Sequence, residues 1–184
     1  MKRVLHLDSF SKLSDEAALA EAKRIIMVSK ARWRQMADSF GIAEPLQGPD
    51  EFKEDCPFAR SLLAIFRYAR NVDVPEFIVR SAIDELLTLM FAGLANGVMA
   101  LPAFDKMADK PWAMAWRIAE LRLIYNSPDP TDTATFAHLM GIPAANIKRE
   151  ITERGFNNPN MVPSIIARAL ISKAVNASQD EEII

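Results

Sequence analysis

The feature that most constrains the fold is a helical repeat of apolar residues along the chain. In the first such stretch, apolar side chains recur at three- and four-residue spacing, at Leu19, Ala22, Ile25, Ile26, Trp33, Met36 and Phe40. This spacing places them on one side of a helix with 3.6 residues per turn, whereas a strand needs alternation at every second residue. Convincing alternation is confined to Val4–Leu7. The sequence therefore predicts an all-α protein, a multi-helix bundle.

Helix-start and helix-stop residues divide the rest of the chain into further helices. The predicted long helices run from about Ser14 to Phe40, Asp55 to Arg70, Asp73 to Asn96, Asp109 to Asn126 and Pro163 to Ala177, with two short helices around Gly141. The Pro- and Asp-rich segment Ser127–Pro130 is the clearest linker. We therefore predict an N-terminal helical domain, residues 1–126, that supplies partner or oligomer contacts, and a C-terminal region, residues 127–184, with an acidic tail.

One uncharged run approaches the length of a membrane span. It covers 19 residues, Leu86–Phe104, and a bilayer core needs about 20 apolar residues in a helix. Asn96-Gly97 predicts a helix end inside the run, and Pro102 interrupts it again. We therefore expect a buried central helix and no membrane contact.

The single cysteine and the N-terminus point to a cytoplasmic protein. Cys56 is the only cysteine, so the chain can form no disulfide within itself, as is typical of the reducing cytosol. The first apolar run is broken by His6 and Asp8, so we expect no signal peptide.

Residues that would carry catalysis are sparse. His6 and His138 are the only histidines, and neither has a cysteine or carboxylate at ligand spacing. The sequence has no glycine-rich phosphate loop and no nucleophile elbow. We therefore predict no metal, no cofactor and no enzymatic activity.

The segment Thr131–Ile151 resembles a helix-turn-helix. Two helices that cross steeply need a small residue where they touch, which is Ala137, and a tight turn favours glycine, which is Gly141. The positions that should face the core are apolar: Phe136, Met140, Ile142, Ile147 and Ile151. The resemblance implies a C-terminal unit of helix-turn-helix type.

In that motif, the helix after Gly141 is the recognition helix. Its outward residues would be Ala145, Asn146, Lys148 and Arg149. Asparagine pairs with adenine, arginine pairs with guanine, and lysine reaches either guanine or a phosphate.

Two features depart from the motif. Glu150 stands where a core contact is usual, three residues after Ile147. Residues 131–154 are also electrically neutral, with Lys148, Arg149 and Arg154 against Asp132, Glu150 and Glu153. A plain hairpin of two helices in a bundle would show the same spacing, so both interpretations stay open.

Two further sets of basic residues each fall on one helical face. They are Lys23, Lys30 and Arg34 in the first helix, and Arg60, Arg67 and Arg70 in the second. Such faces can follow a nucleic-acid backbone. Alternatively, they form solvated edges whose aliphatic stems cover the core. In that interpretation the second set pairs with acids within the fold, such as Asp50, Glu51, Glu54 and Asp55.

The charge balance limits the functional classes. With 22 Lys and Arg against 24 Asp and Glu, the net charge is -2, which excludes a protein that is basic all over but permits a basic face. We expect a non-enzymatic nucleic-acid-binding protein, most simply a helix-turn-helix transcriptional regulator that reads DNA as a homodimer, because one recognition helix touches few base pairs. The alternative is a helical interaction subunit of a larger assembly, nucleoprotein assemblies included, that uses basic helix faces without reading sequence.

Overall fold

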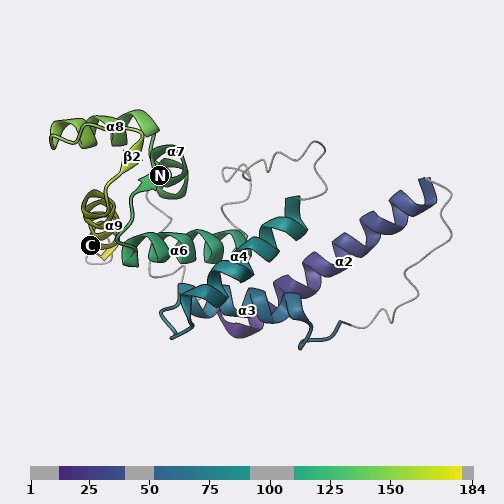
Figure 1. Ribbon diagram of the computed structural model, residues 1–184. Coiled ribbons are helices and arrows are strands. Elements are labelled where there is room, and N and C mark those ends of the chain that lie inside the picture. Colours follow the sequence, from purple (N-terminus) through teal and green to yellow (C-terminus); the bar gives the residue numbers. More distant parts are fainter. Residues whose placement is uncertain (1–12, 40–51, 92–109, 180–184) are drawn as a thin grey trace. The chain divides into compact units, whose positions relative to one another are not determined.

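A computed structural model describes residues 13–39, 52–91 and 110–179 of the 184-residue chain. These residues form seven helices and one two-stranded sheet, which confirms the predicted all-α class (Figure 1). The starts of the five predicted long helices agree with the structure to within three residues. Contacts divide the chain into two compact units, one of Ser14–Leu101 and one of Pro102–Ile184 together with Met1–Leu13.

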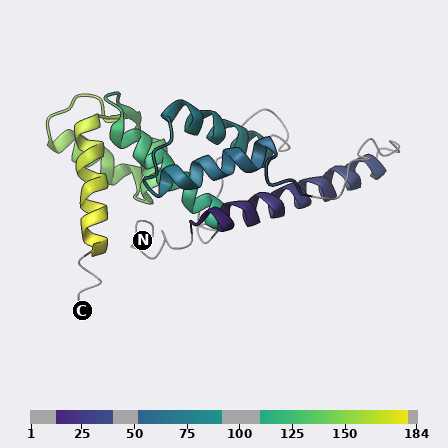
Figure 2. The ribbon, with the colours of Figure 1, turned by 90° about the horizontal axis from the view of Figure 1, so that it is seen from below.

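The first unit contains helices α2 (Asp15–Ser39), α3 (Pro57–Ala69) and α4 (Glu76–Phe91). Helix α2 begins where the sequence predicts, because the Ser14 hydroxyl accepts a hydrogen bond from the Ala17 N–H at 3.1 Å. Helix α3 packs against both α2 and α4 through a side that is almost fully buried. Figures 1 and 2 show the first half of α2 beside α3, with the second half extending beyond it.

The second unit is built from four helices and the sheet. In chain order these are α6 (Pro111–Asn126), β1 (Thr131–Asp132), α7 (Thr133–Met140), α8 (Ala144–Glu153), β2 (Met161–Val162) and α9 (Ser164–Gln179). The strands are antiparallel, with Thr131 opposite Val162. All four helices contribute to one apolar core, in which Phe136, Ile147, Ile151 and Ile166 are fully or almost fully buried.

Helix α6 belongs with the helices that follow it, which differs from the predicted boundary at residue 126. Its Leu121 and Ile124 lie in the same apolar cluster as the buried residues of α7, α8 and α9. The Ser127–Pro130 segment is therefore a short connection inside one unit. Its composition signals a turn, but it carries no information on whether the apolar faces on either side pack together.

The membrane-length run is described only in part. Helix α4 covers it as far as Phe91, and the remainder lies outside the described residues. Within the part of the chain that the structure describes, no helix has the length and apolar character needed to cross a bilayer.

Candidate nucleic-acid interface

Helix α7 is defined by specific caps at both ends. At its start, the Asp132 carboxylate accepts a hydrogen bond from the Thr135 N–H at 2.8 Å. At its end, the N–H groups of Gly141 and Ile142 donate to the carbonyls of His138 and Ala137, which is the Schellman pattern. This pattern needs a left-handed residue, and Gly141 has φ = 64°.

A buried arginine from α6 closes the turn between α7 and α8. Arg117 is only 5% exposed, and its Nε donates a hydrogen bond to the carbonyl of Leu139 in the last turn of α7. A Cβ atom at Gly141 would lie 2.7 Å from Arg117 Nη2. No sequence pattern predicts a role for Arg117, and the one signal for it is that it is the single cation among the apolar residues of 112–119.

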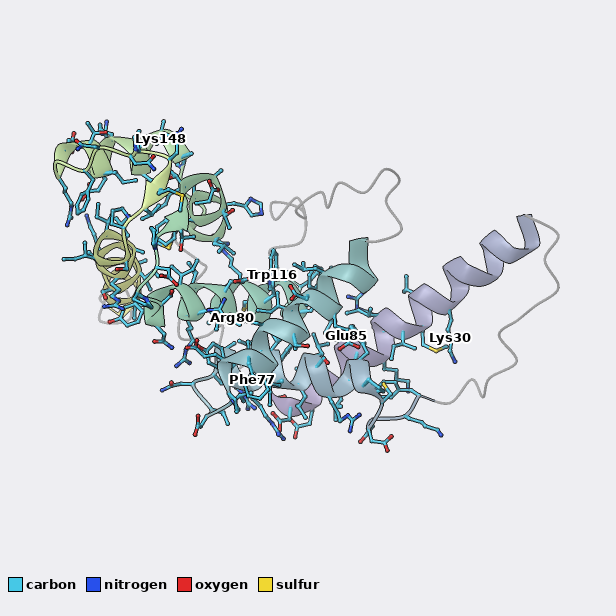
Figure 3. All side chains as sticks on the ribbon, viewed as in Figure 1. Lys30, Phe77, Arg80, Glu85, Trp116 and Lys148 are labelled. Carbon is cyan, nitrogen blue, oxygen red and sulfur yellow. The ribbon has the colours of Figure 1, made fainter. Side chains whose placement is uncertain are left out.

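Helix α8 has one buried face and one exposed face. Of its ten residues, only Ile147 and Ile151 are buried. The four predicted contact residues are all exposed: Ala145, Asn146, Lys148 and Arg149. Figure 3 shows Lys148 on this helix. Figure 1 shows α8 lying across the view while α7 is seen nearly along its axis, so the two helices cross steeply.

Ion pairs account for most of the charge on α8. Glu150, at the position where a core contact is usual, is half-buried and pairs with Arg154 at 2.6 Å. Arg149 and Glu153 are 3.8 Å apart, with side chains 72% and 66% exposed. An ion pair between side chains so exposed stabilises the fold by about 0.2–1 kcal/mol, so Arg149 can leave Glu153 for another partner.

The segment after α8 is held at both of its ends. Gly155 has φ = 81° and, with Phe156, ends α8 in a second Schellman pattern. At the other end, Thr133 donates two hydrogen bonds, from its N–H to the Asn160 carbonyl at 3.0 Å and from its hydroxyl to the Pro159 carbonyl at 2.9 Å. The turn of residues 155–160 is therefore fixed against the start of α7.

The basic face predicted on α3 is largely occupied within the fold. Arg67 pairs with Asp15 at 2.7 Å, and Arg70 bonds the second oxygen of the same carboxylate. The hydrogen bond from Arg67, assisted by the positive charge of Arg70, lowers the pKa of Asp15. Among the described residues, the acid that pairs with these two arginines is therefore Asp15, in the first turn of α2. Of the acids that the sequence suggested, Asp50 and Glu51 lie outside the described residues.

The other predicted basic residues have mixed exposure. Lys23 and Arg60 are exposed, and Lys30 is half-buried. Figure 3 shows Lys30 on α2. The side chain of Arg34 lies outside the described part of the chain. Two of the six residues thus serve the contact between α2 and α3, which weakens the case for a continuous phosphate-binding face.

Within residues 13–39, 52–91 and 110–179, no three His, Cys, Asp or Glu side chains are grouped so that they could hold a metal ion. Comparison with models of protein families, with curated protein sequences and with solved structures finds no match to this chain. A function for this chain must therefore be inferred from the geometry of α7, α8 and the turn that follows them.

Proposed function

We propose that the protein binds DNA through the exposed face of α8, as a helix-turn-helix transcriptional regulator. The observation that carries this proposal is the division of α8, which anchors Ile147 and Ile151 in the core and leaves exposed both Asn146, in its first turn, and Arg149, in its second. The first residues of a recognition helix are those that reach base edges in the major groove. Asn146 suits adenine, and Arg149 suits guanine.

The two polar side chains are placed to act together. At about 100° per residue, Asn146 and Arg149 lie about 60° apart around the helix, so both can face the floor of one groove. Ala145 lies about 40° from Arg149, and its small side chain allows close approach or contact with a thymine methyl group. The exposed face therefore offers base-reading groups on a single stripe.

The low charge of α8 bears on how many copies bind. Phosphate contacts supply much of the affinity for DNA, and two of the three cations in this segment, Arg149 and Arg154, are paired with glutamates. A single copy would therefore bind weakly. Binding of two copies to adjacent half-sites would double the contacts, so we include a homodimer on DNA in the proposal.

The experiment selects binding sites for the full chain from random duplex DNA and then compares variants on the selected site. Asn146→Ala and Arg149→Ala should each relax the preference at one base position and cost about 1–3 kcal/mol of binding free energy. Arg80→Ala is the matched control, because Arg80 forms a similar exposed helical pair with Glu76 at 3.9 Å on α4 in the other unit.

The control variant should select the same site as the wild-type protein. If the wild-type chain shows no affinity for duplex DNA at low salt, or if both α8 variants retain its sequence preference, the proposal fails. The alternative, an assembly subunit with basic helix faces, is disfavoured by the pairing of Arg67 and Arg70 with Asp15.

A further inference from the structure

Lys148 does not lie on the stripe that carries Asn146 and Arg149. It is about 100° around the helix from Arg149 and about 160° from Asn146. The three side chains therefore cannot all face the floor of one groove. Lys148 lies at the edge of the exposed face, and a residue at that edge meets the groove wall, where the phosphates are.

The partner of Lys148 is a neutral amide. Its Nζ donates a hydrogen bond to the Asn160 side-chain oxygen at 2.8 Å. Among the three cations of residues 131–154, Lys148 is the one that forms no ion pair with another described residue. Its positive charge is therefore held in place without being neutralised.

Asn160 is itself held firmly. Its carbonyl accepts a hydrogen bond from the Thr133 N–H at 3.0 Å, and its own N–H donates to the Asn158 side-chain oxygen at 3.1 Å. Its side chain is exposed. The backbone of the turn is thus fixed by contacts that do not depend on the Asn160 side chain.

We infer that Lys148 contacts a backbone phosphate and does not read a base, and that Asn160 is the positioning residue that aims it. The inference rests on the proposed function and assigns one edge of the α8 surface, together with the turn of residues 155–160, to the DNA backbone. An ammonium group has three donors. One is used by Asn160, which leaves two for phosphate oxygens.

The test uses aspartate at two positions of the same turn. Asn160→Asp replaces the neutral partner of Lys148 by a carboxylate that would neutralise it. Asn157→Asp is the matched control, because it adds the same charge to another exposed asparagine of the turn. Affinity of the full chain for the selected duplex and for an unrelated duplex is measured by fluorescence anisotropy between 50 and 200 mM salt.

We expect Asn160→Asp to weaken binding more than Asn157→Asp, and to weaken it equally for the two duplexes. Loss of one phosphate contact in each bound copy should make the plot of log affinity against log salt shallower by about 0.9 per copy, or about 1.8 for a homodimer on its site, so that the loss of affinity over this salt range becomes about threefold smaller per copy. Lys148→Ala should have the same effect on the slope. In the Lys148→Ala background, the two aspartate variants should become equivalent.

Three results would overturn the inference. The first is equal weakening by the two aspartate variants in the wild-type background, because Asn160 would then act only through charge. The second is a change of base preference in Lys148→Ala, because Lys148 would then read a base. The third is that Asn160→Asp still weakens binding more than Asn157→Asp in the Lys148→Ala background, because Asn160 would then not act through Lys148. Absence of all DNA binding by the wild-type chain would instead refute the proposed function.

Discussion

The turn between α7 and α8 can be tested through a single methyl group, in the variant Gly141→Ala. Alanine at φ = 64° costs about 1–2 kcal/mol, because its Cβ crowds the following carbonyl. The new Cβ would also lie 2.7 Å from Arg117 Nη2, so the guanidinium would have to move. This movement would break the hydrogen bond from Arg117 Nε to the Leu139 carbonyl. A hydrogen bond that involves a charged group contributes about 1.5–3 kcal/mol to stability. If that hydrogen bond is lost, the two contributions together lower the unfolding free energy by about 2.5–5 kcal/mol.

Gly155→Ala is the matched control. Gly155 also has positive φ, at 81°, but a Cβ there would have no atom within 4 Å. Only the conformational cost of about 1–2 kcal/mol should remain. The difference between the two variants therefore measures what the contact with Arg117 adds.

Urea denaturation followed by tryptophan fluorescence gives both values. Trp112 and Trp116 are buried in α6, in the same unit as Gly141, and a Trp33→Phe background removes the signal of the other unit. The unfolding free energy is obtained by linear extrapolation. If Gly141→Ala and Gly155→Ala destabilise this unit equally, Arg117 does not hold the turn and the reasoning is wrong.

Three further predictions concern charge and capping. Arg67 lowers the pKa of Asp15, so the Asp15 carboxylate stabilises the fold above about pH 4 and loses this effect as the pH falls through the lowered folded-state pKa. Asp15→Asn should lower the unfolding free energy by about 0.5–1 kcal/mol at neutral pH. In a plot of the urea midpoint against pH, the fall on the acid side should be smaller for this variant than for the wild-type protein. Glu153→Gln removes a negative charge beside Arg149 and should tighten DNA binding and steepen its salt dependence in anisotropy titrations, whereas weaker binding would contradict the role of α8. Asp132→Ala removes the N-cap of α7 and should lower the unfolding free energy by about 1 kcal/mol, so an unchanged urea midpoint would show that the cap is dispensable.

Local patterns identified the helices and the centre of the candidate site. Gly141 was predicted in the turn and Ile147 and Ile151 in the core, and the structure places them there. A left-handed turn and a 3.6-residue repeat are properties of neighbouring residues, so they can be recognised without knowing the rest of the fold. The strands escaped prediction, because two residues each are too few to show alternation.

The contacts that give these residues their roles join distant parts of the chain. Asp15 meets Arg67 across 52 residues, Arg117 reaches Leu139 across 22, and Lys148 meets Asn160 across 12. In the sequence, Arg67 and Lys148 are equally plausible as exposed cations. Only the packing of helices shows that one is paired with a carboxylate and the other with a neutral amide. Periodicity defines which face of a helix is apolar, whereas the partner of a charged side chain depends on which segments the folded core brings beside it.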